Sequence, residues 1–408
     1  MNPVPKEGPS WLDVLCYSTR ALEPPERFFW WSGLAAISAI VKKSVWLDRF
    51  SYVLYPNIYV VLVSARSGLR KGIPISYANG IVDRVGVTRT IAGRNSIQGI
   101  VKSLGEQITL ESGQIINDAQ AFLCTGELDS FLVQDDQALS ILTDLYNTHE
   151  NNNGWKNTLK NSPVEQLKNP CITLLGASNE ALLENVIAEK DMKGGFIART
   201  FIIHERKRRN VNSLMYCPEG LISKGDLADG IMYLKDVKGQ FKIGERVRKE
   251  YDAWYKSLEI DSDADVTGVM ERIGDSVLKV AMLVQLSKGP ELTITTQTMD
   301  TAIEQCEGFL QGIRKISMTQ GKSEIAVFVG LVIKMLLEET NNECERIRAL
   351  QKLHPNVDAM MFDRVMDDLG DTRGKGVVKG PYRKPDKKIY YKLKEEYVEV
   401  YRKFGGKV

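Results

Sequence analysis

The sequence YVVLVSARSGLRKGIPISY, residues 59–77, is the most informative stretch of this 408-residue chain. Together with Ile58 before it, it opens on an unbroken apolar run, rich in β-branched residues, that extends to Val63. A run of this kind, followed by turn-forming residues, is typical of a strand buried on both faces of a parallel sheet. Residues 64–72 then supply glycine and lysine, and the residues after them suit a helix. The stretch therefore predicts a strand, a loop and a helix in direct succession.

The loop in this stretch has features of a phosphate-binding loop. Such a loop binds an anion through backbone N–H groups at a helix start, while a lysine reaches the outer phosphates. The residues expected to bind nucleotide are Ser67, Gly68, Arg70, Lys71 and Gly72. Against the motif G-x-x-x-x-G-K-[ST], only Lys71 matches strictly, because Ala65 and Arg70 replace the glycines. Gly72 replaces the hydroxyl residue that usually binds Mg²⁺. Taken alone, the pattern is better explained as an ordinary strand-to-helix turn with a solvated Arg–Lys pair.

Three further stretches follow in the chain. They read AFLCTGELDSF at residues 121–131, NPCITLLGASNEALL at residues 169–183 and GGFIARTFII at residues 194–203. With the loop, their order and spacing resemble the RecA-like or AAA+-like P-loop ATPases of phages, plasmids and integrated elements, a family that includes replicative helicases and helicase-primases. The resemblance covers roughly residues 10–320. It implies an α/β fold with a P-loop NTPase core and a mostly parallel sheet. Family members often carry arginine before the loop lysine, as Arg70 here, whereas Gly72 departs from their pattern.

The resemblance also implies roles for polar residues near the strand ends. Gly126 stands at the usual aspartate position, and Glu127 at the position of the glutamate that polarises the attacking water. Asn179, with Ser178 as second candidate, would sense the γ-phosphate. Arg199 would act on a neighbouring subunit's nucleotide, a role that suits a permanently charged, forked guanidinium.

Each of these candidate catalytic residues has a structural alternative. Acidic residues such as Glu127 favour the start of a helix. Asn179 would serve well as the N-cap of a helix at residues 180–187. Arg199 would equally fit a structural salt bridge.

The composition is that of an ordinary globular chain, with 43% hydrophobic and 26% charged residues. A net charge of only +2 means that any nucleic-acid-binding surface has to be local. Six scattered cysteines without a C-x-x-C pair, and three distant histidines, favour neither a disulfide framework nor a metal site formed by these residues. No signal peptide is expected. The longest apolar stretch, residues 28–41, is too short to span a bilayer and predicts a core helix. We expect a cytoplasmic protein without a membrane partner.

Four segments are expected along the chain. They are an N-terminal helical segment at residues 1–50, the ATPase core at 51–215, a helical subdomain at 216–320 and a winged-helix-like nucleic-acid-binding domain at 321–408. The strongest helical periodicity in the third segment lies at residues 269–286. Ser96 is expected to cap a helix that begins at Ile97, and Thr298 a helix that begins at Met299.

The last segment concentrates positive charge. Helical patterns at residues 325–337, 345–353 and 358–369 precede two hairpin strands near residues 376–378 and 388–391, an order that suggests a winged helix. Residues 373–394 contain nine Lys or Arg and one acidic residue, Asp386. The residues expected to contact nucleic-acid phosphates are Arg373, Lys375, Lys379, Arg383, Lys384, Lys387 and Lys388. A solvated basic hairpin is the alternative.

The expected function is that of an ATP-dependent DNA helicase or translocase in the replication of a phage or mobile element. Its cofactors would be ATP and Mg²⁺, and its partner DNA, single-stranded or at a replication fork, in a bacterial or archaeal host cell. A homo-oligomer, such as a hexameric ring, is expected. Gly72 and Gly126 together remove both standard protein-side Mg²⁺ ligands and leave hydrolysis open. The alternatives are therefore a non-hydrolysing DNA-binding or scaffold protein of the same fold, and an ATP-switched replication initiator.

Overall fold

The structure is a computed structural model that describes most of the chain. The described residues are 8–64, 67–93, 96–110, 113, 115–128, 137–146, 154–157, 165–180, 195–213, 222–258, 268–320, 324–353, 359–370 and 376–398. The chain divides into two compact units, Met1–Arg314 and Lys315–Val408. The expected segments 1–50 and 51–215 both lie within the first unit.

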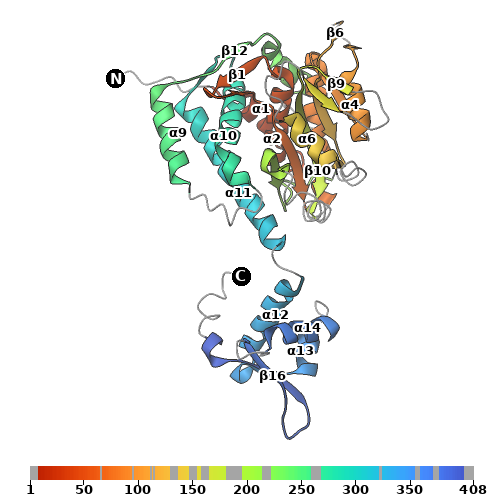
Figure 1. Ribbon diagram of the computed structural model, residues 1–408, viewed down its shortest axis with the longest axis vertical. Helices are drawn as coiled ribbons and strands as arrows, with labels where there is room; N and C mark the ends of the chain where they lie inside the picture. Colours follow the sequence, from red (N-terminus) through yellow and green to blue (C-terminus); the bar gives the residue numbers. More distant parts are fainter. Residues whose placement is uncertain are drawn as a thin grey trace. The chain divides into compact units, whose positions relative to one another are not determined.

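A five-stranded sheet, in which every strand is parallel to its neighbours, forms the centre of the first unit (Figure 1). Its strands are β3 (Tyr59–Ser64), β4 (Arg89–Ala92), β7 (Gln120–Thr125), β10 (Cys171–Asn179) and β11 (Thr200–His204). Their order across the sheet is β11-β3-β10-β7-β4. The expected α/β class with a parallel sheet is confirmed. All six residues of β3 are buried, as the apolar run predicted.

Helices surround this sheet, and short strands lie outside it. Among the described residues, the α-helices that begin in the first unit are α1 (Trp11–Ser18), α2 (Glu26–Val41), α3 (Gly72–Val85), α4 (Ile97–Gly105), α6 (Ala138–Tyr146), α8 (Lys224–Asp229), α9 (Glu245–Ser257), α10 (Val269–Leu286) and α11 (Thr296–Gln320). The short strands are β1 (Val45–Asp48), β2 (Val53–Leu54), β5 (Ile108–Thr109), β6 (Ile115–Ile116), β8 (Trp155–Asn157), β9 (Glu165–Leu167), β12 (Gly239–Gln240), β13 (Lys242–Ile243) and β14 (Thr293–Ile294).

Strand register shows which helices cover which face of the sheet. The hydroxyl of Tyr59 in β3 donates to the carbonyl of Leu142 in α6 at 2.9 Å. Leu174 of β10 lies opposite Tyr59, so its neighbour Thr173 points to the other face. There the hydroxyl of Thr173 lies 2.7 Å from that of Ser38 in α2. Helices α2 and α6 therefore cover opposite faces, and α3 packs beside α2.

Helix α2 accounts for the longest apolar stretch of the sequence. Its side chains are almost all buried, and Trp31 packs against Phe201 of β11 with ring centroids 4.7 Å apart. The expected core helix is thus confirmed. In the described part of the chain, none of the helices combines the length and apolarity that a membrane crossing requires.

One of two predicted helix caps is confirmed. The hydroxyl of Ser96 accepts a hydrogen bond from the backbone N–H of Gly99 at 3.1 Å, at the start of α4. The prediction for Thr298 is wrong, because α11 begins at Thr296 and the hydroxyl of Thr295 accepts from the N–H of Thr298. Thr298 is fully buried and donates its own hydroxyl to the side chain of Gln285 at 2.9 Å.

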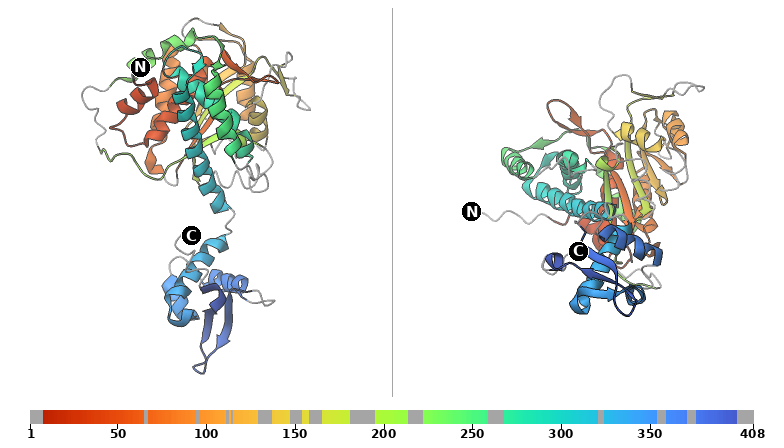
Figure 2. Two further views of the ribbon diagram at one scale, coloured as in Figure 1. Left: turned by 90° about the vertical axis from the view of Figure 1, so that its left-hand side faces the viewer. Right: turned by 60° about the horizontal axis from the view of Figure 1, so that its bottom comes forward.

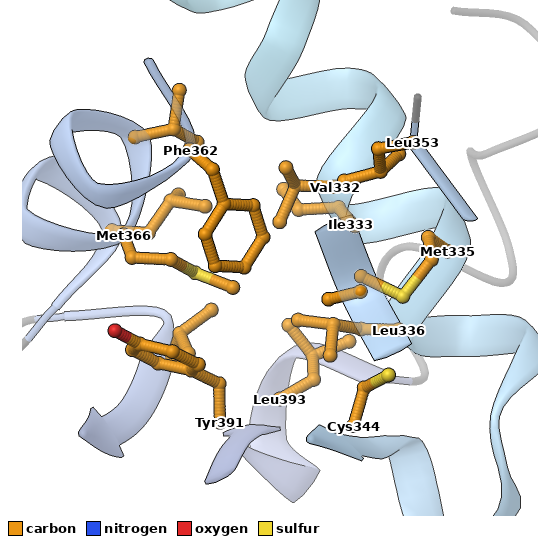
Figure 3. Packing of buried hydrophobic residues seen from close by; sticks show 14 of the residues in the cluster. Val332, Ile333, Met335, Leu336, Cys344, Leu353, Phe362, Met366, Tyr391 and Leu393 are labelled. Carbon is orange, nitrogen blue, oxygen red and sulfur yellow. The ribbon is translucent and has the colours of Figure 1, made fainter. Parts of the chain in front are cut away.

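The second unit contains helices and a three-stranded antiparallel sheet. Its elements are α12 (Glu324–Glu338), β15 (Glu343–Glu345), α13 (Arg346–Leu353), α14 (Ala359–Leu369), β16 (Val378–Arg383) and β17 (Ile389–Leu393). The strand order is β15-β17-β16. Figure 3 shows the core, in which Phe362 of α14 meets Tyr391 of β17 edge to face, beside Leu336 of α12. The β16–β17 hairpin extends from this core (Figure 2).

Candidate functional site

Polar residues from three strands meet at the carboxyl edge of the central sheet. Ser64 ends β3, and it lies directly opposite Asn179, which ends β10. His204 ends β11 on the other side of β3. The carboxyl edge is where open parallel sheets bind their ligands, because helix N-termini and loops converge there. This edge is therefore the first candidate for a binding site.

The Lys71 ammonium lies at this edge, as the loop pattern predicted. Its Nζ donates a hydrogen bond to the hydroxyl of Ser64 at 2.7 Å. Lys71 is also the residue before α3, whose first helical residue is Gly72. Pro74 occupies the first turn, where its missing N–H is not needed. A lysine, a strand end and the positive end of a helix dipole thus coincide, which is a favourable arrangement for an anion.

Arg70 adopts the backbone conformation that usually selects glycine. Its φ is 50°, in the left-handed region, at the position where the motif has its second glycine. Its guanidinium forms an ion pair with Glu23, a side chain that is only 2% exposed. Arg208, which follows β11, donates to the same carboxylate at 3.0 Å. Burial by itself raises the pKa of Glu23, but hydrogen bonds from Arg70 and the Asn212 backbone lower it below its ordinary value. Arg70 therefore has a partner inside the protein.

The glycines at this edge are not required by packing. A Cβ atom added to Gly68, Gly72 or Gly126 would meet no heavy atom within 4 Å. None of the three has a positive φ. Ser67 opens the short 3-10 turn Ser67–Leu69. The hydroxyl and the carboxylate expected at positions 72 and 126 are therefore absent without a steric reason, and open space lies beside both positions.

Glu127 and Asn179 lie at the same edge as Lys71. Thr125, the last residue of β7, lies opposite Gly176 of β10. Glu127 comes two residues later and therefore lies close to the end of β10. Glu127 is exposed, and its backbone N–H donates to the hydroxyl of Thr125 at 3.3 Å. Asn179 is half-buried. The helix expected after it at residues 180–187 lies, beyond Glu180, outside the described residues.

Arg199 lies at the opposite edge. Thr200 is opposite Tyr59, which places Arg199 level with Ile58 and six residues from Ser64 along the strand direction. At about 3.3 Å a residue this is roughly 20 Å. The guanidinium of Arg199 donates to the carbonyl of Gly195 at 2.7 Å. The structure thus brings together Lys71, Glu127 and Asn179 and separates them from Arg199.

Two cations of α10 lie beside Arg199. The sequence pointed to Arg272 as a surface ion pair or as a second sensor of the nucleotide, and it missed Lys279. Arg272 and Lys279, from α10, line the same cavity of about 360 Å³. They lie one to two helical turns apart in the chain, but some 70 residues from Arg199. The only available signal was their shared helix face, and the loop motif drew attention to the other edge.

The basic hairpin of the second unit is partly neutralised. Lys384 forms an ion pair with Glu343, and Lys388 pairs with Glu345 at 2.9 Å; both glutamates belong to β15. Among the described residues, Lys379, Arg383 and Lys387 are exposed and have no ion pair. Arg373 and Lys375 lie outside the described residues. Three of the seven expected contacts are therefore exposed cations available to a partner.

The oxygen atoms at the carboxyl edge decide whether a metal ion could bind there. Among the residues that the structure describes, no group of three or more His, Cys, Asp and Glu is arranged to hold a metal ion. Mg²⁺ on a nucleotide needs few protein ligands, because phosphate oxygens and water complete its shell. The side-chain oxygens of Glu127 and Asn179 could serve as such ligands.

Comparison with models of known protein families and with curated proteins finds no match to this chain.

Proposed function

We propose that the first unit binds ATP at the carboxyl edge of its sheet, as a P-loop ATPase of the replicative-helicase type from a phage or mobile element. The position of Lys71 carries the proposal. Its ammonium lies 2.7 Å from the last residue of β3, at the first turn of α3, which is where the outer phosphates of a bound nucleotide would lie.

The connections of the sheet support the same edge. Helix α3 follows β3 on one face, whereas α6 follows β7 on the opposite face, and β10 lies between those two strands. Ligands of open α/β sheets bind where the connections change face in this way. Ser64 and Asn179, paired across β3 and β10, mark that point.

Each residue then has a role in hydrolysis. Lys71 binds the outer phosphates and holds their charge. Glu127 orients and polarises the water that attacks the γ-phosphorus, and Asn179 contacts the γ-phosphate or that water. Mg²⁺, carried on the nucleotide, supplies further neutralisation of phosphate charge. Because Arg199 lies about 20 Å from this edge, it is assigned to the nucleotide of a neighbouring copy, which makes the proposed enzyme an oligomer.

The second unit supports action on nucleic acid. Its order of elements, one helix, a strand, two helices and a hairpin, is that of a winged helix. Lys379, Arg383 and Lys387 give the hairpin exposed positive charge. We propose that this unit binds DNA through phosphate contacts, within the cytoplasm of a bacterial or archaeal host.

A second candidate keeps the nucleotide site but not the hydrolysis. Gly72 and Gly126 offer neither the hydroxyl nor the carboxylate that usually binds Mg²⁺, although both positions have room for them. This favours a protein that uses bound ATP as an assembly switch, or a scaffold that binds DNA without turnover.

An ATPase assay with and without single-stranded DNA separates the candidates. The helicase-type proposal expects hydrolysis that DNA stimulates and that Lys71→Ala abolishes. Lys249→Ala, which removes an exposed lysine from α9, is the matched control and should retain full activity. Nucleotide binding without turnover in the wild type would favour the switch, and absence of nucleotide binding would favour the scaffold.

A further inference from the structure

The cavity at the amino edge of the sheet is separate from the proposed ATP site. It has a volume of about 360 Å³ and lies beside the starts of β3, β10 and β11, near Asn57, Cys171 and Arg199. Helix α10 contributes another wall, with Arg272 and Lys279. Small-molecule sites typically have volumes of about 300–1,000 Å³. The cavity is therefore large enough for a small ligand.

Positive charge dominates its lining. Four cations, Lys43, Arg199, Arg272 and Lys279, face one carboxylate, that of Asp275. The carboxylate is already engaged, because both of its oxygens lie 2.8 Å from the hydroxyl of Tyr52. The surplus of cations in a partly enclosed space favours an anion carrying more than one charge.

Two of these cations lack a carboxylate partner. Within the described part of the chain, neither Arg199 nor Arg272 forms an ion pair. The Nε atom of Arg199 is buried and has no hydrogen-bond partner. Burial, and to a smaller extent the charge of nearby Arg272, lower the pKa of Arg199. Arg272 is itself exposed, but a buried nitrogen such as the Nε of Arg199 usually has a partner, and an anion would supply one.

Lys279 is held in place for a further contact. Its ammonium donates to both the backbone carbonyl and the side-chain oxygen of Asn57, each at 2.9 Å, and lies 3.9 Å from the ring centre of Tyr146. An ammonium has three protons, so one remains for a ligand. The side chain is only 5% exposed, and its position is therefore fixed by packing.

We propose that this cavity binds a small phosphate-bearing ligand whose phosphate contacts Arg199, Arg272 and Lys279. A forked guanidinium pairs with phosphate oxygens through two parallel hydrogen bonds, and a doubly charged anion balances the surplus of cations. The tyrosine side chains of Tyr52, Tyr55 and Tyr146 line the space that remains and suit a planar or apolar ligand group. The phosphate comes either from a free small molecule or from a nucleotide bound to a second copy.

Binding should be coupled to proton uptake at Lys279. Burial lowers the pKa of Lys279 to about 7. Smaller effects come from Cys171 and Asp275, which raise it, and from Arg199 and Arg272, which lower it further. The charged or titratable groups around it are Cys171 from β10, Arg199 before β11, Tyr146 from α6, and Arg272 and Asp275 from α10. An anion stabilises the charged ammonium, so the ligand-bound pKa rises. Affinity should consequently decrease as the pH rises above 7.

Calorimetric titration of the full chain with inorganic pyrophosphate tests the site. It is performed on Lys71→Ala protein, so that the proposed ATP site does not contribute phosphate contacts. We expect saturable binding that weakens about tenfold or more in Arg272→Gln and in Lys279→Met. Arg246→Ala, an exposed arginine of α9 paired with Glu250, is the control and should bind as the parent does.

Repeating the titration at pH 7 in two buffers of different ionisation enthalpy measures the protons exchanged. We expect the parent protein to take up about half a proton more than Lys279→Met does, because a group with a pKa near 7 is half protonated in the free protein. The proton exchange of pyrophosphate itself is common to both proteins and cancels in this difference. Equal proton exchange in the two proteins, or binding unchanged in both cavity variants, would overturn the assignment.

A second arm distinguishes the two sources of phosphate. If the phosphate belongs to a nucleotide on a second copy, pyrophosphate should bind weakly, and ATP-dependent self-association in sedimentation should be lost in Arg272→Gln. If neither pyrophosphate binding nor this self-association depends on Arg272 and Lys279, the cavity is not a phosphate site. Failure of ATP binding at Lys71 alone would leave the pyrophosphate titration unaffected, because that titration is performed on Lys71→Ala protein.

Discussion

Arg70 shows how one residue can reconcile a backbone requirement with a side-chain contact. Its φ of 50° costs a non-glycine residue on the order of 1 kcal/mol or more. The ion pair with buried Glu23 gives arginine a compensating role that glycine lacks. Glycine is common at this motif position because of the backbone, and the arginine here adopts the same backbone.

The two contributions at Arg70 can be separated by comparing two substitutions. Arg70→Ala and Arg70→Gly both remove the ion pair with Glu23, but only glycine adopts the left-handed conformation without strain. We expect the glycine variant to be more stable than the alanine variant by about 1 kcal/mol in denaturant unfolding. Equal stabilities would contradict the strained conformation.

Glu127 is expected to affect hydrolysis more than nucleotide binding. It is exposed and follows β7, so Glu127→Gln preserves shape and removes only the charge that polarises water. ATP should bind with nearly unchanged affinity while turnover falls by at least tenfold. Glu245→Gln, on α9, is the matched control. A parallel loss of binding and turnover would instead identify Glu127 as a structural residue or a metal ligand.

At the scale of elements, the buried strands of the central sheet were predictable and the small strand β15 was not. β3, β7 and β10 are buried on both faces, so their sequences are continuous apolar runs that few other structures produce. A helix was expected from residue 345; it begins one residue later, at Arg346, and Glu345 instead ends the unpredicted strand β15. Its residues, Glu-Cys-Glu, carry no strand signal, and the strand exists because it pairs with β17.

Of the two candidate sites, one could be predicted from the sequence and the other could not. The carboxyl edge was predictable, because parallel strands present their C-terminal residues at one edge and the chain order gives Ser64, Glu127 and Asn179. The amino-edge cavity was not, since Arg199 and the α10 residues become neighbours only through packing. Pairing of Lys384 and Lys388 with β15 was also unpredictable, because it depends on the unexpected strand.

The β16–β17 hairpin should bind DNA through its unpaired cations. Replacing Lys379 and Lys387 with alanine removes two exposed charges, whereas Lys388→Ala removes one that is paired with Glu345. We expect the double variant to flatten the slope of log affinity against log salt by roughly one to two, about 0.9 for each lost duplex contact. Unrelated DNA sequences should weaken equally, since phosphate contacts carry no direct sequence information.

Lys388→Ala is the control variant. It should change the slope of log affinity against log salt less, because the charge of Lys388 is already paired with Glu345. Affinity that does not vary with salt, in fluorescence anisotropy from about 50 to 200 mM, would rule out phosphate contacts by this hairpin.

At the scale of the whole molecule, the separation of Arg199 from Lys71 requires a second copy if both serve one reaction. Mixing wild-type protein with Arg199→Ala should then depress ATPase activity more than dilution explains, because mixed assemblies contain incomplete sites. The measurement is activity against the fraction of variant at constant total protein. Strictly proportional loss would mean that Arg199 serves only its own chain, as in the phosphate-binding cavity.

The central claim is that nucleotide phosphate binds beside Lys71 at the carboxyl edge of β3. Equilibrium titration of the purified full chain with ATP, in the presence of Mg²⁺, tests it most directly. We predict saturable binding that Lys71→Ala weakens about tenfold or more. The circular dichroism spectrum should stay unchanged, because the lysine side chain is not part of the hydrophobic core, although it donates to the buried hydroxyl of Ser64. Lys249→Ala should bind as the wild type does. Equal ATP affinity in wild type and Lys71→Ala would contradict the claim.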